Sequence, residues 1–376
     1  MTPKEKLAAL RGDIDALDNE LITLFQKRMA ISDTVADIKI EGNLAMVDAT
    51  REQQIVQRVM QKGETPAEQG EIAGFMRSLM AFSKMRQSQK LFSGLTLGFP
   101  EIAAPKAGSL KVAFQGVAGA WGQKAAGTLY PEAELCPSED FEDVFLSVKD
   151  GRADYGVLPI ENSQTGAIGE VYDLLRRHGC FVVGETWIGI AQCLLGLPGT
   201  ALAEVREVVS HPEGLKQCRR FLRSHAWDLT ACRNTAYAAQ MVADKKEKRL
   251  AAIGSRLAAE IYGLEVLVPD IMDNRQNQTR FIAIAAQPEA DESCDTTFIT
   301  FSTTHVAGAL CSVLQTFMVA GINLSRIESR PVSAEKYRFF ADLQASVLRP
   351  ETMETLKQAA QHCDYFEILG CGQARR

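Results

Sequence analysis

The chain has 376 residues and a net charge of −6, with 46% hydrophobic and 23% charged residues. This length predicts two or three domains, and the composition is that of an ordinary globular protein. The acidic balance leaves no extended basic surface for a nucleic acid, and no stretch approaches the roughly 18 apolar residues of a membrane span.

The cysteines and histidines indicate a reducing compartment and no metal site. The nine cysteines are scattered singly, and the five histidines show no ligand spacing. We therefore expect no disulfides and no metal, and a cytoplasmic protein. Residues 1–11 contain no apolar segment, so no secretory signal is expected.

Residues 4–41 are predicted to form one long helix. Its apolar residues recur in alternating steps of three and four, which is the pattern of a helix–helix seam. They are Leu7, Leu10, Ile14, Leu17, Leu21, Leu24, Ile31, Val35 and Ile38. A helix of this span would be on the order of 50 Å long. It is too long for one small domain, so we expect it to pack against a partner chain.

Arg28 stands where this seam calls for an apolar residue. A buried cation costs several kcal/mol unless it is paired. Arg28 is therefore either a partner in a buried ion pair, a residue that sets the helix register, or a cation reserved for an anionic ligand. Arg11 and Lys39 flank it on the same column of the helix.

Two further helices are predicted before a linker. Asp48 can cap a second helix that ends at Lys62, and the capping box that starts at Thr65 opens a third helix that ends near residue 92. The apolar stripe of the third helix continues into Ser83 and Gln87. Because all three helices place polar groups on inward faces, we predict a wet, cationic pocket between them. Residues 93–109 are rich in glycine and proline and form the predicted linker.

From residue 110 onwards, strands and helices alternate in an α/β pattern. The predicted strands are 110–115, 154–160, 180–184, 189–195, 206–210, 228–232, 249–253, 265–269 and 280–286. The predicted helices are 121–129, 139–149, 167–178, 213–224, 235–246 and 255–262. The turns 116–120 and 210–214 could direct backbone N–H groups at carboxylates. No complete nucleotide-binding motif is present, so no nucleotide cofactor is expected.

Polar side chains gather at the ends of two of these strands. Thr279 and Arg280 adjoin the apolar run 282–286, and the strand 154–160 leads into Glu161, Asn162 and Ser163. A hydroxyl donor beside a cation at a strand end suits an anionic substrate that must lose a hydroxyl group. The alternative is a loop that enters a strand, with Thr279 as a strand former and Arg280 in water.

After the acidic linker 288–295 the order of the predicted strands and helices changes. Its predicted order is strand 296–303, helix 308–320, strand 322–330, strand 336–346, helix 351–362 and strand 365–371. This βαββαβ order is that of a ferredoxin-like binding module.

Three motifs closely resemble those of the bacterial bifunctional chorismate mutase–prephenate dehydratase family of phenylalanine biosynthesis. They are Pro159-Ile160-Glu161-Asn162-Ser163, Asn277-Gln278-Thr279-Arg280-Phe281 and Glu328-Ser329-Arg330-Pro331. The resemblance covers essentially the whole chain. It implies a multidomain fold with an all-α three-helix mutase domain at 1–92, which forms an intertwined dimer, and a linker at 93–109. It further implies a two-lobed α/β dehydratase domain at 110–288, resembling type II periplasmic-binding folds, and a ferredoxin-like ACT regulatory domain at 296–373.

The resemblance implies a bifunctional enzyme. Chorismate would be rearranged to prephenate, and prephenate dehydrated and decarboxylated to phenylpyruvate, with feedback inhibition by L-phenylalanine and no cofactor. The expected assembly is a homodimer or a higher homo-oligomer, with no nucleic-acid or membrane partner. Two alternatives are a monofunctional prephenate dehydratase with a vestigial helical domain and an amino-acid-sensing binding protein.

The family's functional residues map onto matching positions of this chain. The catalytic residues implied are Thr279, Lys39, Gln87 and Arg28. The substrate-binding residues implied are Arg11, Asp48, Arg51, Glu52, Ser83, Glu161, Asn162, Ser163, Ser210, His211, Gln217 and Arg280. The effector-binding residues implied are Gly308, Ala309, Leu310, Asn323, Leu324, Glu328, Ser329 and Arg330. Cys311 stands where the family more often has valine, a small apolar change that we expect to tune affinity.

Overall fold

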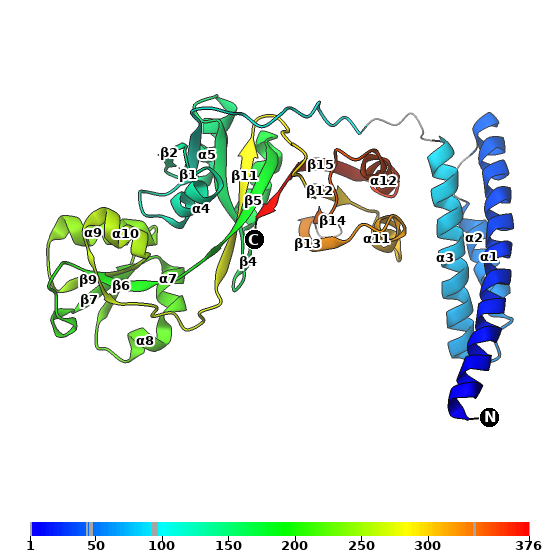
Figure 1. The fold of residues 1–376 in the computed structure, drawn as a ribbon, viewed down its shortest axis with the longest axis horizontal. Helices are drawn as coiled ribbons and strands as arrows, with labels where there is room; N and C mark the ends of the chain where they lie inside the picture. Colours follow the sequence, from blue (N-terminus) through cyan, green and yellow to red (C-terminus); the bar gives the residue numbers. More distant parts are fainter. Residues whose placement is uncertain (1, 43, 45–47, 92–96, 334–335, 376) are drawn as a thin grey trace.

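The computed structural model describes residues 2–42, 44, 48–91, 97–333 and 336–375. Figure 1 shows a helical region, a two-lobed α/β region and a C-terminal module placed between them. The segment that follows residue 96 crosses from the helices to the α/β region, and residues 93–96 of the predicted linker lie outside the described residues.

The helical region consists of α1 (Pro3–Glu41), α2 (Ala49–Met60) and α3 (Pro66–Leu91). Thr2 and Glu5 form a capping box at the start of α1, and the Asp48 side chain accepts a hydrogen bond from the Arg51 N–H at the start of α2. α1 packs on α3 through the buried Met29, Ser32 and Ala36.

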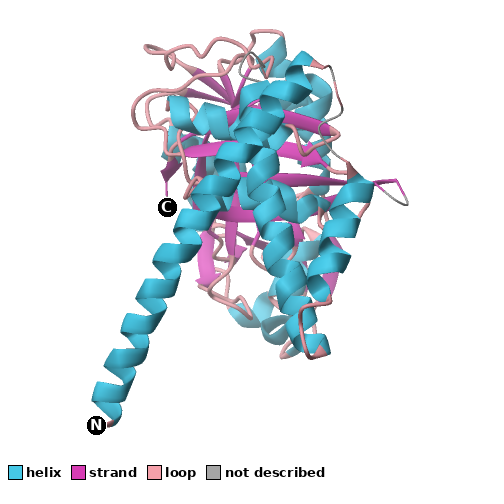
Figure 2. Ribbon diagram, turned by 90° about the vertical axis from the view of Figure 1, so that its right-hand side faces the viewer, coloured by secondary structure: helices cyan, strands magenta, loops and turns pink. Residues whose placement is uncertain are grey.

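The predicted seam of α1 lies on another face and is exposed to solvent. Leu7, Leu24 and Ile31 are 51%, 61% and 65% exposed, and the N-terminal part of α1 projects away from the rest of the molecule in Figure 2. Arg28 therefore lies at the border between the face that packs on α3 and the exposed stripe. A stripe of this length left in water marks a surface for another protein chain.

The first α/β lobe contains a mixed sheet. Its strands are β1 (Lys111–Gln115), β2 (Glu134–Ser138), β3 (Tyr155–Asn162), β4 (Gly166–Ala167), β5 (Phe181–Gly189) and β11 (Gln278–Ala285). Its helices are α4 (Trp121–Leu129), α5 (Phe141–Lys149) and α6 (Gly169–His178). β1 pairs in parallel with β2 and β3, whereas β11 runs antiparallel between β3 and β5. The start of β11 therefore lies beside the end of β3.

The second lobe is a five-stranded sheet in the order β10-β6-β9-β7-β8. Its strands are β6 (Cys193–Gly196), β7 (Glu207–Ser210), β8 (Asp228–Ala231), β9 (Leu250–Gly254) and β10 (Glu265–Val268). Its helices are α7 (Pro212–Gln217), α8 (Arg219–Arg223), α9 (Thr235–Lys245) and α10 (Arg256–Tyr262), with a short 3-10 helix at Leu202–Glu204.

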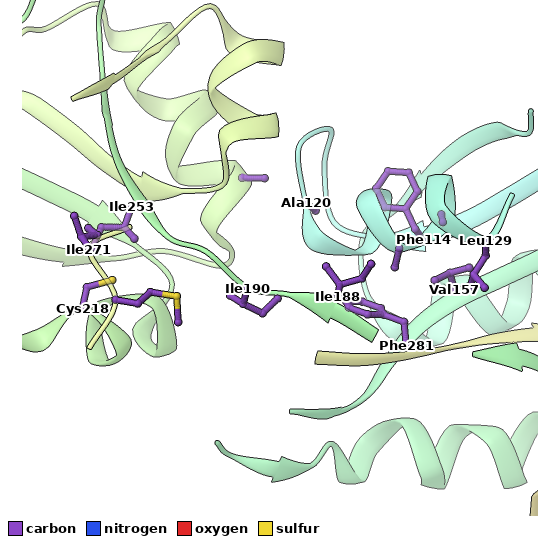
Figure 3. Close-up of a cluster of buried hydrophobic side chains, with 14 of the residues drawn as sticks. Phe114, Ala120, Leu129, Val157, Ile188, Ile190, Cys218, Ile253, Ile271 and Phe281 are labelled. Carbon is purple, nitrogen blue, oxygen red and sulfur yellow. The ribbon is translucent and has the colours of Figure 1, made fainter. Parts of the chain in front are cut away.

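Two connecting segments join the lobes and run side by side. The N–H of Ile190 donates to the carbonyl of Asn277 at 2.9 Å, and the N–H of Ile271 donates to the carbonyl of Gln192 at 3.0 Å. One hydrophobic cluster continues through this junction: Figure 3 shows Ile188 and Ile190 between the side chains of the two lobes. The cleft between the lobes thus has a packed apolar floor.

The C-terminal module has the predicted βαββαβ order. Its elements are β12 (Thr296–Ser302), α11 (Ala309–Val319), β13 (Leu324–Ser333), β14 (Lys336–Leu343), α12 (Pro350–Ala360) and β15 (Tyr365–Gly372), followed by β16 (Ala374–Arg375). β15 and β16 pair with β5, so the module and the first lobe share one sheet of eleven strands. They also share a core, because Phe298, Phe340 and Leu369 pack in one cluster with Tyr172 and Ile282. The predicted boundary at 288–296 therefore separates two regions of the sequence, but these regions do not have two independent hydrophobic cores.

The elements follow the predicted order with three differences. First, β2, β4, β16 and the 3-10 helix Leu202–Glu204 were not predicted. Second, the predicted helix 213–224 is divided into α7 and α8 at Cys218. Third, the predicted strands 180–184 and 189–195 are β5 and β6 with a break at 190–192. Among the described residues, none of the helices is both long and apolar enough to cross a membrane.

Gly370 is required where β15 meets β5. Its φ is +141°, and a Cβ there would meet the carbonyl oxygen of Val182 at 2.0 Å. We expect Gly370→Ala to destabilise the joined first lobe and module by at least about 2 kcal/mol, because backbone must move to admit the methyl group. Urea unfolding followed by near-UV circular dichroism measures this change.

The matched control is Gly189→Ala on β5, where a Cβ would meet no described atom within 4 Å. This variant should stay within about 0.5 kcal/mol of the wild type. Equal midpoints for the two variants would contradict the close approach of β15 and β5.

Candidate active sites

The first site is a polar cluster between α1 and α3. Arg28 Nη1 donates to the Leu79 carbonyl at 2.8 Å and to Ser83 Oγ. Lys39 Nζ donates to Gln87 Oε1 at 3.4 Å. Ser83 and Gln87 are buried, and burial lowers the pKa of the Arg28 guanidinium from its ordinary value. Two cations thus face two buried neutral groups in this cluster.

The other predicted residues of the helical region lie at different distances from this cluster. Glu52 on α2 forms a salt bridge with Lys84 on α3 at 3.2 Å. The Asp48 side chain caps α2, and Arg51 is exposed. Arg11 is exposed and lies 17 residues before Arg28 on the same helix, which corresponds to about 25 Å. Arg11 cannot reach the cluster of its own chain.

The second site is the cleft between the two α/β lobes, with a volume of about 460 Å³. Four predicted residues line it: Asn162, His211, Gln217 and Thr279. Twelve lining residues were not predicted, and most of them end a strand or begin a helix, which is the signal that could have found them. They are Gln115, Trp121, Asp140, Phe141, Glu170, Ile190, Gln192, Glu213, Gly214, Arg233, Asn234 and Thr235.

The Thr279 hydroxyl is oriented by its neighbour on β3. Asn162 Nδ2 donates to Thr279 Oγ1 at 2.9 Å and to Asn277 Oδ1 at 2.9 Å. The N–H groups of Gln164 and Thr165 donate to Asn162 Oδ1, which fixes which end of the amide faces Thr279. Because Thr279 Oγ1 accepts from Asn162, its own proton can point into the cleft.

His211 is held as a neutral donor at the cleft. Its Nδ1 accepts a hydrogen bond from the Glu213 N–H at 3.2 Å, so the neutral ring carries its proton on Nε2. Burial lowers the pKa of His211, and the charge of Glu213 opposes this shift. The imidazole can therefore donate a hydrogen bond to a ligand without being charged.

Five helices begin at the lining of this cleft. α4, α5, α6, α7 and α9 each contribute a residue of the first turn or the N-cap to the lining: Trp121, Asp140 and Phe141, Glu170, His211, and Asn234. Each helix start carries a partial positive charge of roughly half a unit. Among the described lining residues, Arg233 of the second lobe alone is a permanent cation. Its Nη1 lies 3.6 Å from Glu139 Oε1 of the first lobe.

Two predicted residues support the cleft from outside its surface. Ser210 is fully buried, and its Oγ donates to the Ile253 carbonyl at 3.0 Å. Ser163 Oγ accepts from the Gln278 N–H at 3.0 Å and lies 3.3 Å from Asn277 Oδ1. Both side chains fix the strand ends that carry lining residues.

Arg280 and Glu161 do not line the cleft, contrary to the prediction. Arg280 Nη1 lies 2.6 Å from Asp342 Oδ2 of the C-terminal module, and its Nε donates to Glu185 Oε2 at 2.7 Å. Glu161 Oε2 lies 2.8 Å from Arg326 Nε of the same module. Successive residues of a strand face opposite sides, so the neighbours of Thr279 and Asn162 must point away from the cleft.

The predicted effector residues fall into two groups in the module. Gly308 caps α11 with a φ of +87°, close in sequence to Ala309 and Leu310, and Asn323 Nδ2 donates to Gln344 Oε1 at 2.8 Å just before Leu324 on β13. Arg330 instead reaches the first lobe, where it lies 3.7 Å from Asp173 and over the Tyr172 ring, and Glu328 lies 3.6 Å from Arg326. Ser329, between them, is exposed.

Comparisons with known proteins match each region of this architecture. The family model described as chorismate mutase type II matches residues 10–88, and the one described as prephenate dehydratase matches residues 112–289. The bifunctional chorismate mutase/prephenate dehydratase of Escherichia coli K12 is 30% identical over 99% of this chain and 97% of its own length.

Two solved structures resemble about 70% of this chain. The prephenate dehydratase of Arthrobacter aurescens, solved in complex with L-Phe, has a TM-score of 0.63 at 26% identity and covers 70% of this chain and 90% of its own. The prephenate dehydratase of Staphylococcus aureus has a TM-score of 0.61 at 28% identity, with 70% and 100% covered.

Proposed function

Because this chain belongs to the bifunctional chorismate mutase–prephenate dehydratase family and converts chorismate to prephenate and prephenate to phenylpyruvate, we propose that its two polar sites divide these reactions between them. The cluster around Arg28 carries out the rearrangement, and the cleft around Thr279 carries out the dehydration. The observation that carries the second assignment is the Asn162–Thr279 hydrogen bond, which leaves a hydroxyl proton free to point into the cleft.

The mutase site binds a dianion and needs no proton transfer. The rearrangement of chorismate is pericyclic, so the protein has only to hold the compact conformer and stabilise the charge that develops on the breaking ether bond. Arg28 supplies a carboxylate partner, and Lys39 with Gln87 supplies donors for the ether oxygen. Ser83 holds the Arg28 guanidinium on α3, and Glu52 is positioned to accept from the substrate hydroxyl.

This mutase site is completed by a second copy of the chain. Arg11 lies about 25 Å from Arg28 on one helix, so it serves the site of the partner. The exposed stripe from Leu7 to Ile38 supplies the apolar surface for an intertwined dimer. Asp48 and Arg51 lie at the start of α2, where they can border the entrance.

In the dehydratase site, the carbon–oxygen bond to the ring hydroxyl and the bond to the ring carboxylate break together. The electron pair released with carbon dioxide enters the ring, and the hydroxyl leaves with the pair of the carbon–oxygen bond. Thr279 donates a hydrogen bond to this leaving oxygen. Where its proton is transferred as well, water departs and the threonine regains a proton from solvent. Aromatisation supplies most of the driving force, which is why so weak an acid suffices.

Prephenate is a dianion, and the cleft holds it with few cations. We assign its two carboxylates to the helix starts, to Arg233 and to the Nε2 proton of His211. The carboxylates of Asp140, Glu170 and Glu213 also border the cleft, and they exclude a ligand with a third negative charge. Gln192 and Gln217 provide neutral groups that satisfy the keto and hydroxyl oxygens.

The C-terminal module is proposed to be a regulatory ACT domain that binds L-phenylalanine. The Arthrobacter aurescens relative was solved in complex with L-Phe. In this chain, Gly308 leaves open space at the start of α11, and β13 is the edge strand of the sheet. Two modules paired through these surfaces could enclose an amino acid, and the effector would inhibit by its higher affinity for a less active arrangement.

The intertwined mutase can be tested by mixing variants within one dimer. Arg11→Ala and Arg28→Ala homodimers should each lose mutase activity by about 10²-fold or more, since each lacks one carboxylate or charge partner. A heterodimer of the two full-length chains, purified through two different tags, should regain about half of the wild-type rate, because one of its two sites holds both arginines. A heterodimer as inactive as its parents would show that Arg11 does not serve the partner's site.

Thr279→Val removes the hydroxyl and keeps the shape of the side chain. We expect it to lower the dehydratase kcat by about 10²-fold to 10⁴-fold, and Thr279→Ser to retain much more activity because the donor survives. The assay supplies chorismate to each full-length variant and follows prephenate and phenylpyruvate, so mutase turnover serves as the internal control. If the valine and serine variants lose the same activity, the threonine serves packing and not proton donation.

Phenylalanine binding is tested at the two ends of α11. Gly308 and Gly321 both have positive φ angles, and a Cβ at either would meet no described atom within 4 Å. Calorimetry should show that Gly308→Ala weakens L-phenylalanine binding about tenfold or more, because the methyl group obstructs close approach to the helix start. Gly321→Ala carries the same backbone strain and should bind as the wild type does. Equal affinities in both variants would place the effector elsewhere.

A further inference from the structure

Five charged side chains meet between the dehydratase strands and the C-terminal module. We call them the interface cluster: Glu161 of β3, Glu185 of β5, Arg280 of β11, Arg326 of β13 and Asp342 of β14. The side chains of Arg280, Glu185, Asp342 and Arg326 are only 5%, 7%, 8% and 12% exposed. Buried charges of this kind are held only where geometry and pairing are good, so each fixes the position of the others.

The cluster joins the two domains through two close contacts, and a third contact holds Arg280 within its own sheet. Arg280 lies 2.6 Å from Asp342 of the module and 2.7 Å from Glu185 of its own sheet. Arg326 of the module lies 2.8 Å from Glu161. Burial would lower the pKa of Arg280, but the charges of Asp342 and Glu185 outweigh it and raise that pKa. The guanidinium is therefore a permanent cation clamped between two carboxylates.

The same strands carry the reacting groups on their opposite faces. Thr279 precedes Arg280 on β11, and Asn162 follows Glu161 on β3, with Thr279 paired to Asn162 and Arg280 to Glu161 in the sheet. Adjacent Cα atoms are about 3.8 Å apart, and their peptide bond is rigid. A displacement of Arg280 or Glu161 must therefore tilt Thr279 or Asn162, whose 2.9 Å hydrogen bond aims the hydroxyl proton.

We propose that Asp342 and Arg326 are positioning residues for the dehydration. Through them the module contacts β11 and β3 on the face opposite the cleft and thereby sets the Thr279–Asn162 geometry. This proposal rests on the role assigned to Thr279 above. The module acts on the turnover step and not on substrate affinity, because the interface cluster does not line the cleft.

Asp342→Asn is the informative substitution because it should leave the fold intact. The five cluster residues carry two positive and three negative charges, and Glu328 lies 3.6 Å from Arg326, so both arginines still face carboxylates when the charge of Asp342 is removed. The asparagine oxygen can still accept from Arg280, but the ionic clamp is lost. We expect the dehydratase kcat to fall about tenfold, since small misplacements of a reacting group carry costs of this size, while KM stays within about twofold.

Thr300→Val is the matched control within the module. Thr300 is fully buried on β12, and its Oγ1 donates to the Phe339 carbonyl at 3.0 Å, but it belongs to no charge pair. This variant should keep the wild-type dehydratase kcat. Arg326→Lys is a second test of the interface cluster. It keeps the positive charge but removes the planar guanidinium group, and it should lower kcat by a few-fold. Circular dichroism and limited proteolysis of the full-length variants establish that they are folded.

A double-mutant cycle separates this proposal from the role of Thr279. In the Thr279→Val background there is no hydroxyl to aim, so Asp342→Asn should lower kcat by less than about twofold further. A wild-type kcat in folded Asp342→Asn or Arg326→Lys overturns the proposal, and so does an equal loss in Thr300→Val or a full additional loss in the Thr279→Val background. If Thr279→Val itself remains fully active, the proposed chemistry fails, whereas the comparison of Asp342→Asn with Thr300→Val still decides whether the module sets the rate.

Discussion

The pleat of β11 and β3 is the constraint on which the dehydratase half of this protein depends. Because successive residues of a strand face opposite sides, the sequence Thr279-Arg280 must present a hydroxyl to one side and a cation to the other. The cleft occupies the first side, and the C-terminal module occupies the second. A single pair of strands thus carries the reacting group and the contact with the module, one residue apart.

Periodicity in the sequence predicted most elements of the fold, since helices and buried strands repeat their apolar residues regularly. β2 escaped because Pro137 and a mostly half-buried edge position give it no continuous apolar run. The site was harder to predict. The strand ends indicated Thr279 and Asn162, which line the cleft, but Arg280 was assigned to the cleft because it is a cation next to Thr279 at the same strand end. Strand alternation already excluded that assignment. The far side of β11 is covered by the C-terminal module. The partner of Arg280 there is Asp342, which lies 62 residues later in the sequence, so the sequence around Arg280 does not identify it.

The helical region depends on a different constraint, the length of one helix. Arg11 and Arg28 lie on the same α1, and a straight helix cannot fold back to bring them together. The stripe from Leu7 to Ile38 is exposed over the same length. The intertwined dimer proposed above accounts for both facts, because a second α1 would cover the stripe and each chain would supply its Arg11 to the site of the other. In contrast, the described residues that line the cleft of the α/β region come from both lobes of the chain.

The regulation proposed for the dehydratase depends on how the module is attached. The module shares a sheet and an apolar core with the first lobe, so it cannot swing freely as a tethered domain would. In the proposed regulation, an effector bound between two modules would act through small rotations of β13 and β14 against β11 and β3. Such rotations alter buried charge pairs steeply, because the pairs lie in a medium that screens them weakly. If the effector binds one arrangement of the modules modestly more tightly than another, the position of the Thr279 hydroxyl would change through this interface, without any opening of the cleft.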